Sequence, residues 1–424
     1  MKSFRYLTAL GLSLGLFSAP AADAVLISTK SLGMAGVGYG YAFDGMAAAH
    51  NPGAAAALDS RFDTGLIFSH LKGNTTFVDN ALGPLVNGKY NGYHRTKNFY
   101  SPYFGLNYNV DCNLTVGLVV YNRDLAKTTY KDPFVLLGTS PAGLEYLHET
   151  VSPYIAYRYG CHNFGVSVNW EIQRAKVNGF ENFAAPSNLL ASVFPNDVTN
   201  KGYNWSNGVG FTFGYYVHLT DTLNFGVSYQ PKTKMSRFKK YRGFLADAGK
   251  FDVPEKVGVG FSWRFLQCAT FAFDYEYVHW TQVKAVKNKL LNEEGELNQL
   301  GSENGPGFGW TDKHYFRFGL DYAWNDCLTL RLGYRYAPTQ IKPSQTVLNG
   351  FTLEPLVENI LTAGFSWGIT CCDEVDFFAA YGFDKKMNGR DSVPPGAPPA
   401  GFYGGNANLD QDIIAVGIGW GHRF

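Results

Sequence analysis

Apolar and polar residues alternate one by one over long stretches of this chain. In the clearest stretch, Val257, Val259, Phe261, Trp263 and Phe265 share one face, with small, polar or charged residues between them. Side chains of a β-strand point alternately to its two faces, so a period of two predicts a strand with one apolar face. After a turn near residue 268, the alternation resumes with Phe271, Phe273, Tyr275 and Tyr277. The two stretches predict an antiparallel pair of strands.

The same unit of two strands, a short turn and a longer loop repeats from residue 61 onward. The strand-like stretches lie at residues 61–71, 99–110, 113–123, 151–159, 163–174, 206–217, 222–232, 255–266, 269–280, 313–324, 327–337, 358–369, 374–384 and 411–424. An even number of such strands, with no linker between them, is typical of a bacterial outer-membrane barrel. We therefore expect an all-β fold, a transmembrane antiparallel β-barrel of fourteen strands over residues 61–424.

An even strand count also places both chain ends and the short turns on the periplasmic side, with the long loops outside. A soluble β-sandwich is the alternative, but sandwich strands bury one face in a shared core. Here the apolar face is broad, flanked by aromatic residues and repeated around too many strands for that fold. Lipid offers no hydrogen-bond partner to an open strand edge, so the first and last strands are expected to pair.

The end of the chain supports the same assignment. Ile414, Val416, Ile418 and Trp420 alternate with small residues, and the chain stops at Phe424. A C-terminal aromatic residue on such a strand resembles the signal read by the barrel assembly machinery. His422 departs from the apolar residue that is usual two places before the end.

The N-terminus predicts export. A basic start at residues 1–5 precedes an apolar run at residues 6–17, and Ala22-Asp23-Ala24 offers a cleavage site, so we expect a signal peptide over residues 1–24. A membrane anchor is the alternative, but the run is shorter than the roughly 20 residues of a spanning helix. The formal net charge of +1 gives no basic field for nucleic acid, which is not expected as a partner.

Residues 25–60 precede the first strand and show no alternation. They are rich in Gly and Ala and contain Asn51, Pro52 and Gly53. This stretch resembles the N-terminal hatch of the FadL/TodX family of hydrophobic-compound transporters, in which an Asn-Pro-Ala motif precedes a fourteen-stranded barrel. Gly53 replaces the usual Ala. The resemblance implies a plug over residues 25–60 with Asn51, Pro52 and Gly53 at the gate, whereas a flexible linker with a turn is the generic alternative.

Two features of the predicted wall suit a plug. Inward-facing glycines at 208, 210, 214, 226, 258 and 260 leave room for it, and charged residues Asp274, Glu276, Arg317, Asp321, Arg331 and Arg335 are candidates to tether it. A water-filled pore lined by the same charges is equally compatible with the sequence. The resemblance further implies lateral release of ligand beside a kinked third strand, where Gly117 is a candidate for the kink or an ordinary strand glycine.

Two predicted external loops, residues 181–197 and 235–251, carry several apolar residues. Apolar residues exposed to water usually mark a surface that binds or packs against something. The candidates for ligand capture are Phe183, Leu189, Leu190, Val193, Phe194, Phe238, Tyr241, Phe244 and Leu245. Arg237, Lys239, Lys240 and Arg242 are candidates to attract a carboxylate at the rim of a groove, if residues 189–194 form one helical face. Loops that pack over the barrel mouth, and basic residues that bind lipopolysaccharide phosphates, are the alternatives.

All six cysteines fall in predicted turns on the periplasmic side: Cys112, Cys161, Cys268, Cys327, Cys371 and Cys372. Their spacing fits no zinc site, and export favours oxidation. Neighbouring turns lie roughly 10 Å apart, farther than the roughly 7 Å that a disulfide spans between Cα atoms. We therefore hypothesise disulfides to other envelope proteins; free thiols or bonds within one chain are the alternatives.

The sequence gives little support for an enzyme. The nine His are scattered, and no H-E-x-x-H, G-x-S-x-G or phosphate-loop pattern occurs. We expect no enzyme activity, no cofactor and no metal. The sequence favours passive transport of long-chain fatty acids or related hydrophobic compounds across the outer membrane, with outer-membrane lipid and lipopolysaccharide around the barrel. A general porin for small hydrophilic solutes and a structural envelope protein held by cysteines are the competing functions.

Overall fold

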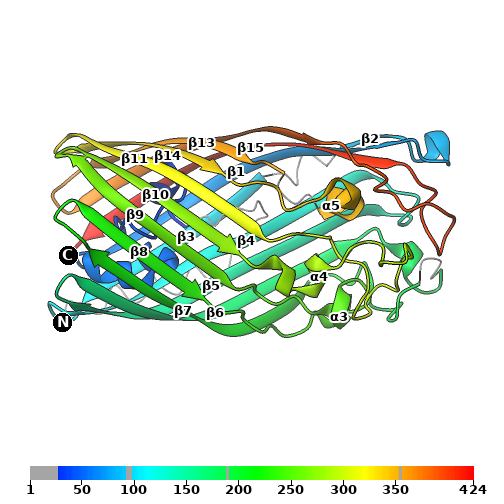
Figure 1. The fold of residues 1–424 in the computed structure, drawn as a ribbon, viewed down its shortest axis with the longest axis horizontal. Coiled ribbons are helices and arrows are strands. Elements are labelled where there is room, and N and C mark those ends of the chain that lie inside the picture. Colours follow the sequence, from blue (N-terminus) through cyan, green and yellow to red (C-terminus); the bar gives the residue numbers. More distant parts are fainter. Residues whose placement is uncertain (1–26, 92–97, 188–190, 353–355) are drawn as a thin grey trace.

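One antiparallel sheet of 15 strands wraps into a closed barrel in the computed structural model, which describes residues 27–91, 98–187, 191–352 and 356–424 (Figure 1). Closure comes from β15, which pairs with β14 on one side and with β1 on the other. The short strand β2 pairs only with the far end of β1 and lies outside the closed ring. The ring therefore has the fourteen strands and the all-β barrel fold that the alternation predicted, and this prediction is confirmed.

The strands are β1 (Arg61–Val78), β2 (Gly88–Asn91), β3 (Asn98–Asn109), β4 (Leu114–Pro133), β5 (Pro141–Tyr159), β6 (His162–Asn178), β7 (Asn204–His218), β8 (Leu223–Gln230), β9 (Lys256–Leu266), β10 (Ala269–Val278), β11 (Lys313–Asn325), β12 (Leu328–Tyr336), β13 (Asn359–Gly368), β14 (Asp373–Met387) and β15 (Asn406–Arg423). Each is antiparallel to its neighbours.

The helices are short. They are α1 (Thr29–Gly33), α2 (Ala47–His50), α3 (Ala246–Gly249), α4 (Lys284–Lys287) and α5 (Thr346–Thr352), with 3-10 turns η1 (Pro52–Ala57), η2 (Gly83–Leu85), η4 (Glu181–Phe183), η5 (Lys239–Tyr241), η6 (Trp280–Gln282) and η7 (Pro343–Gln345). Within the described ranges, no helix combines the length and the apolar character needed to cross a membrane.

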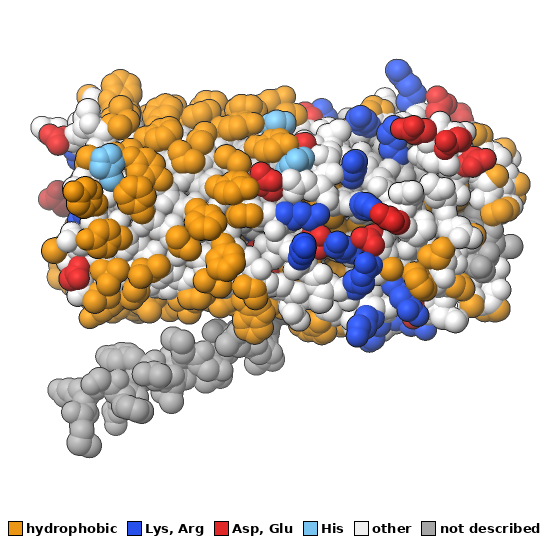
Figure 2. Space-filling view, turned by 60° about the horizontal axis from the view of Figure 1, so that its bottom comes forward, with side chains coloured by type: hydrophobic (Ala, Val, Ile, Leu, Met, Phe, Trp, Pro, Cys, Tyr) orange, Lys and Arg blue, Asp and Glu red, His pale blue; other side chains and the backbone are white. Residues whose placement is uncertain are grey.

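The outer surface carries an apolar belt that is visible as a broad band at one end of the molecule (Figure 2). On β15, the predicted apolar face points outward, with Ile414, Ile418 and Trp420 between 41% and 48% exposed, whereas Ala415 on the other face is buried. A barrel in a membrane needs apolar residues on the outside, where they face lipid. It needs small or polar residues on the inside, where they face the filled lumen. Phe424 closes this surface with its ring 6.0 Å from that of Phe62 on β1.

Several strands extend well beyond the predicted segments on the side opposite the C-terminus. β1 continues to Val78, β4 to Pro133, and β5 begins at Pro141 rather than at residue 151. Outward positions in these extensions are polar, for example Lys127 and Glu145, so the apolar alternation stops while the hydrogen-bonded ladder continues. The sequence pattern thus marked the part of each strand that faces lipid, not the whole strand.

The long-loop end of the lumen is filled by aromatic side chains. We call Phe77, Tyr130, Phe134, Phe180 and Phe351 the outer cluster; all five are buried, and the rings of Phe134 and Phe351 lie 4.3 Å apart. Helix α5 supplies Phe351 from a loop, and β1 and β4 supply Phe77 and Tyr130. The outer cluster and its neighbours form a hydrophobic core above the belt.

The short-turn end of the lumen is filled instead by residues 27–60, which lie inside the wall before β1 begins (Figure 1). Helix α1 contacts strands β12 to β15, and η1 contacts β5, β6 and β7. We call the described residues 27–60 the hatch. The predicted signal peptide, residues 1–24, lies outside the described residues.

Candidate functional site

The Asn-Pro-Gly segment of the hatch lies directly on the glycines of the wall. The Asn51 side-chain amide donates to the carbonyls of Tyr39 and Tyr215 at 3.0 and 2.9 Å, and its oxygen accepts from the amide of Gly53 at 3.0 Å. A Cβ added to Gly214 would lie 2.2 Å from the Asn51 side-chain oxygen, and one on Gly53 would lie 2.9 Å from the Gly214 carbonyl. Both glycines therefore allow a backbone approach that Ala would obstruct.

Other predicted wall glycines receive the same loop. Added Cβ atoms on Gly226 and Gly258 would collide with Tyr39, at 1.8 Å from its carbonyl and 2.0 Å from its ring. Gly208 and Gly210 differ, because they face Thr233 and Met235 of a loop rather than the hatch. The remaining position, Gly260, lies against Gly40 of the hatch. Four of the six predicted glycines, Gly214, Gly226, Gly258 and Gly260, thus make room for the hatch.

Buried charges on β10 and β11 bind the hatch backbone. Asp274 accepts hydrogen bonds from the amides of Gly38 and Tyr39 at 2.6 and 3.0 Å. The Tyr39 hydroxyl donates to Glu276, which also pairs with Arg317 at 3.2 Å. Asp274 and Glu276 are therefore direct tethers, while Arg317 neutralises a tether and packs beside the hatch.

The remaining predicted tethers act less directly. Arg331 donates to Asp321 at 2.9 Å and to Ser366, and its side chain lies beside Gly33 of α1. Arg335 lies farther along the wall, with its guanidinium 5.6 Å from the ring of Tyr315. From the sequence alone, Arg331 and Arg335 could equally have lined a water-filled pore.

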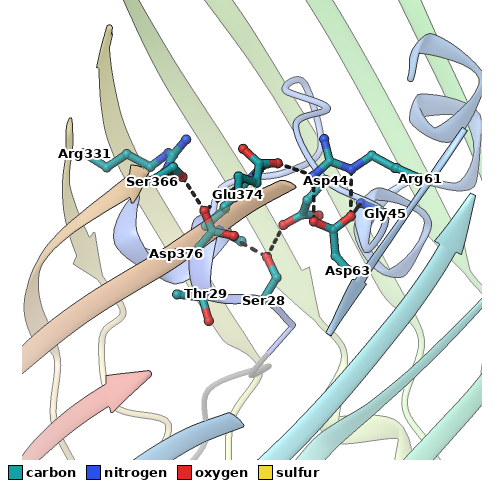
Figure 3. A network of polar contacts seen from close by, with 12 residues as sticks. Ser28, Thr29, Asp44, Gly45, Arg61, Asp63, Arg331, Ser366, Glu374 and Asp376 are labelled. Carbon is teal, nitrogen blue, oxygen red and sulfur yellow. Dashed lines mark hydrogen bonds and ion pairs between the residues drawn. The ribbon is translucent and has the colours of Figure 1, made fainter. Parts of the chain in front are cut away.

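A second polar network fixes the start of the hatch to β1 and β14 (Figure 3). Ser28 donates to Asp44 at 2.5 Å, and Asp63 accepts from the amide of Gly45 at 2.6 Å and from Arg61. Burial and the neighbouring Asp63 raise the pKa of Asp44 to about 6. Lys30 of α1 forms an ion pair with Glu374 in the same network. These polar contacts add to apolar packing of the hatch on the wall, where Met46 and Ala55 share a hydrophobic cluster with Ile67.

A layer of buried charge lies between the hatch and the loop end of the lumen. His148 bridges Asp124 and Glu171, at 2.9 Å from each, and Arg123 contacts Glu171 at 3.4 Å and Gln230 at 2.7 Å. These residues come from β4, β5, β6 and β8, so the charges project into the lumen from one side of the ring. Opposite charges alternate through it, which compensates their removal from water.

Above this layer lies a pocket whose surface is mostly apolar. Its lining includes seven aromatic side chains, Tyr146, Phe238, Tyr241, Phe251, Trp280, Phe308 and Trp310. Asp124 is the one charged residue in the described lining, and it faces His148 of the charge layer. A concave, mostly apolar site with few polar groups is the usual form of a small-molecule site.

Three of the predicted capture residues, Phe238, Tyr241 and Leu245, line this pocket. Phe183 and Phe244 are buried in the surrounding core. Val193 is 37% exposed, and the ring of Phe194 lies 4.5 Å from the Arg242 guanidinium. Leu189 and Leu190 lie outside the described residues.

The expected helical face at residues 189–194 is not found in its described part. Ser192 forms a strand bridge with Leu300, and Ala191 has a positive φ of 46°. An extended bridge is incompatible with a helix because it turns the backbone groups toward a neighbouring segment. Val193 and Phe194 therefore do not belong to an amphipathic helix.

The structure places the four predicted carboxylate-attracting residues on the outer side of their loop, away from the pocket. Arg237 pairs with Asp247 at 3.1 Å and Arg242 with Asp197 at 2.6 Å. Lys240 donates to the Tyr203 carbonyl at 3.0 Å, and Lys239 is exposed. The intervening Phe238 and Tyr241 point inward instead. The structure does not assemble a cationic rim at the pocket.

The barrel wall is not uniformly hydrogen-bonded beside this pocket. The β3–β4 ladder runs from Asn109↔Thr115 to Phe104↔Val120 and then stops, although β3 continues to Asn98. Past that point, Asn122 donates to the Ser101 hydroxyl at 2.9 Å. We call this stretch, residues 98–103 facing 121–126, the seam. Asp124, Leu125 and Ala126 line the pocket from the seam.

Gly117 does not mark the irregularity in this strand. It pairs in register with Asn107 and Tyr154, whereas the β4–β5 register shifts between Asn122 and Asp124. A Cβ on Gly117 would lie 2.4 Å from the Tyr154 hydroxyl, so the glycine makes room for that ring. The bulge at Arg123 turns that residue into the charge layer, and the expectation of a kink at Gly117 is corrected to this position.

All six cysteines lie in or beside turns at the hatch end of the barrel. Cys112, Cys161, Cys327 and Cys371 are exposed, Cys268 and Cys372 are partly exposed, and no bond joins any two of the six. The sulfur atoms of Cys371 and Cys372 lie 3.3 Å apart. Among the described residues, no group of three His, Cys, Asp or Glu side chains is placed to hold a metal ion.

Together these features define a class of protein: an outer-membrane barrel plugged at one end, with an apolar pocket above the plug and a weakened seam in its wall. Comparison with known proteins identifies the family. Residues 15–409 match the family model described as outer membrane protein transport protein (OMPP1/FadL/TodX). The chain belongs to this family of outer-membrane transporters of hydrophobic compounds, and the resemblance inferred from residues 25–60 is confirmed.

Solved structures support the same fold. The Pseudomonas putida toluene transporter TodX is 14% identical, with a TM-score of 0.66 and coverage of 93% of this chain and 97% of that one. The Ralstonia pickettii toluene transporter TbuX is 17% identical, with a TM-score of 0.61 and the same two coverages, 93% and 97%. A Pseudomonas aeruginosa FadL homologue is 14% identical, with a TM-score of 0.63 and coverage of 95% and 99%. No curated protein matched the chain.

Of the fourteen residues that line the pocket, only Phe238, Tyr241 and Leu245 were predicted from the sequence. Phe308 and Trp310 come from the loop between β10 and β11, which carried no strand pattern, and Trp280 lies just after β10, at the end of the predicted strand 269–280. Tyr146 lies in the part of β5 that the apolar alternation did not reveal. An available signal was the Gly-Pro-Gly-Phe-Gly-Trp run at residues 305–310, where large aromatic residues stand among turn-forming ones.

Proposed function

We propose that this barrel takes up small, neutral hydrophobic compounds, aromatic ones among them, through the pocket above the charge layer. The observation that carries this proposal is the pocket lining, in which seven aromatic side chains accompany a single charged residue, Asp124. A carboxylate ligand would enter without a cation in the described lining and would face Asp124, so its desolvation would go uncompensated. The toluene transporters named above support this choice over long-chain fatty acids.

The route that we propose ends at the seam rather than in the periplasm. An apolar ligand gains free energy by leaving for lipid and gains none by crossing the charge layer of Arg123, His148 and Glu171. The seam lies beside the pocket, and the ladder there is replaced by a single side-chain bond from Asn122 to Ser101.

Uptake of labelled toluene and of a labelled long-chain fatty acid, by cells with and without this barrel, tests the proposal. Faster entry of toluene, with little change for the fatty acid, is expected. Ala175→Trp should abolish most of the toluene effect because Ala175 is buried and lines the pocket. Ala323→Trp, at an exposed position of β11, is the matched control. Faster entry of the fatty acid alone would contradict the choice of ligand, and faster entry of a sugar alone would favour a porin.

A second role in the envelope is favoured by the position of the cysteines. Five of the short turns carry the six thiols, and none of the six residues is buried. We propose that these thiols form disulfides with cysteine-bearing envelope proteins. A periplasmic disulfide donor accepts the two electrons: a barrel thiolate attacks its disulfide, and a partner thiolate then displaces the donor as a dithiol.

Non-reducing electrophoresis of intact cells tests this second role. High-mass species that collapse to monomer with reductant are expected, and replacing all six cysteines with Ser should remove them without changing toluene uptake. A monomer alone under non-reducing conditions would contradict the cross-links.

A further inference from the structure

The outer surface changes from apolar to basic along β6. Phe164, Val166, Val168 and Trp170 point outward and are exposed, and Arg174 and Lys176 occupy the same face farther along. Figure 2 shows Lys and Arg side chains gathered where the apolar belt ends. The strand register continues this row sideways, with Lys176 opposite Glu145 and Glu145 opposite Lys127.

Tyr203 organises this group. Its hydroxyl donates to Glu145 at 2.8 Å, and its ring centroid lies 4.5 Å from the Arg174 guanidinium and 5.5 Å from the Lys176 amine. Lys240 reaches the Tyr203 carbonyl from the loop at 3.0 Å. We call Lys127, Arg174, Lys176, Lys240, Glu145 and Tyr203 the basic cluster.

The basic cluster has more positive charge than its own residues neutralise. Lys127 and Lys176 share Glu145, at 3.4 and 3.1 Å. Arg174 and Lys240 form no ion pair within 4.0 Å with any residue that the structure describes. Glu149 on β5 is a second carboxylate near Arg174. Four cations therefore face two carboxylates, on a surface that borders lipid.

The structure assigns to the basic cluster a binding site for the phosphate group of a phosphorylated glycolipid in the outer leaflet. Its height suits a headgroup, because Trp170 precedes Arg174 on the outward face of β6 and Trp205 on β7 is the register partner of Arg174. The two Trp side chains are 52% and 53% exposed. Arg and Lys together recognise phosphate through charge-assisted hydrogen bonds. Acyl chains would lie along the belt beneath, a contact that free phosphate lacks.

Charge on another side of the barrel differs. Lys386 at the end of β14 lies 3.7 Å from Asp384, and Asp410 of β15 is its register partner. Acidic residues there outnumber the cation, so that surface is not expected to hold a phosphate. Lys386 therefore provides a matched control for an exposed lysine outside the basic cluster.

Binding of lipid A to the full-length barrel in nanodiscs tests this site. Bisphosphorylated lipid A should bind the native protein and should bind the triple variant Arg174→Gln, Lys176→Gln, Lys240→Gln on the order of 10- to 100-fold more weakly, given the typical contribution of each cation near a charged surface. Lys386→Gln should bind as the native protein does. Dephosphorylated lipid A should bind the native and triple-variant proteins equally weakly.

Two further measurements separate the phosphate contact from a loss of folding. Arg174→Lys with Lys176→Arg keeps both charges and should retain most of the binding, and binding should weaken as salt is raised. Toluene uptake by the triple variant reports on the pocket independently. Equal binding of phosphorylated and dephosphorylated lipid A to the native protein, or native-level binding by the triple variant, would overturn the proposal.

Discussion

The two ends of the lumen are closed by different mixtures of polar and apolar contact. At the short-turn end, small apolar residues of the hatch pack on the wall, and hydrogen bonds such as those of Asp274 with Gly38 and of Asn51 with Tyr215 also hold it. At the loop end, the outer cluster packs aromatic rings, with Phe134 and Phe351 4.3 Å apart. The charge layer of Arg123, His148 and Glu171 separates the two.

This difference suggests a division of labour. Polar contacts can be exchanged for contacts with water at a small net free-energy change, so a polar plug can shift without losing its solvation. An aromatic lining excludes water and offers dispersion contacts to an apolar guest. The outer cluster with its pocket is therefore suited to receiving a ligand, and the partly polar hatch is the end where we propose that movement occurs.

Deleting residues 27–58 is expected to have the largest effect, because it leaves a fourteen-stranded barrel with an open lower lumen. Small-ion conductance in a planar bilayer should rise by on the order of tenfold or more, as expected for a wide barrel without its plug. Unchanged conductance would show that the outer cluster alone closes the pore.

The matched comparison is Phe351→Ala in the outer cluster. This change should leave conductance low because the hatch persists, and it should reduce toluene uptake by loosening the core around the pocket. If Phe351→Ala raised conductance as much as the deletion does, the proposed difference between the two ends would be wrong.

A disulfide across the seam should have the next largest effect, on toluene uptake. Ser101→Cys with Asn122→Cys, in a background with the six native cysteines replaced by Ser, joins two side chains that lie 2.9 Å apart. Toluene uptake should fall by about tenfold when the bond forms and recover with reductant, a reversal that a folding defect would not show.

The control for the seam is a second cysteine pair, Phe104→Cys with Val120→Cys. These residues already face each other in the hydrogen-bonded part of the β3–β4 ladder. A bond there should leave uptake unchanged. Equal inhibition by both pairs would argue against lateral release at the seam.

Asn51→Ala should have an intermediate effect confined to the hatch end. It removes two hydrogen bonds to backbone carbonyls and one from Gly53, each costing about 1 kcal/mol or more when a buried partner is left unpaired. We expect brief conductance openings in single-channel records and unchanged heat stability of the barrel. A closed channel identical to the native one would show that Asn51 is not part of the gate.

The smallest effect concerns pH. Because the pKa of Asp44 rises from 3.8 to about 6 in the docked hatch, docking is favoured below the ordinary pKa and this contribution is lost as pH rises through 6. The facing groups are Asp63, Lys30, Arg61 and Ser28. Protease cleavage of the hatch should therefore be slower at pH 5 than at pH 7.5.

Asp44→Asn should remove most of this pH dependence. His50 is not expected to contribute, since burial lowers its pKa to about 3 and keeps it neutral over the range. A variant that retained the native pH profile would assign the effect to another group.

The sequence predicted the barrel well because lipid imposes a simple rule. On β9 and β15 every second side chain must be apolar, so Val257 to Phe265 and Ile414 to Trp420 showed their strands without an alignment. Asn51, Pro52 and Gly53 were found through their resemblance to a known hatch, and the glycines that receive them through alternation. These signals are local along the chain.

The pocket and the seam could not be found in this way. Trp310 and Tyr146 meet only because a loop after β10 folds back over β5, and the bulge at Arg123 depends on cross-strand register. The sequence alone determined which faces meet lipid, since that choice is repeated at every strand. The tertiary structure decided which charges hold the hatch and which aromatic rings enclose the pocket, because those contacts join different strands and loops rather than neighbours along the chain.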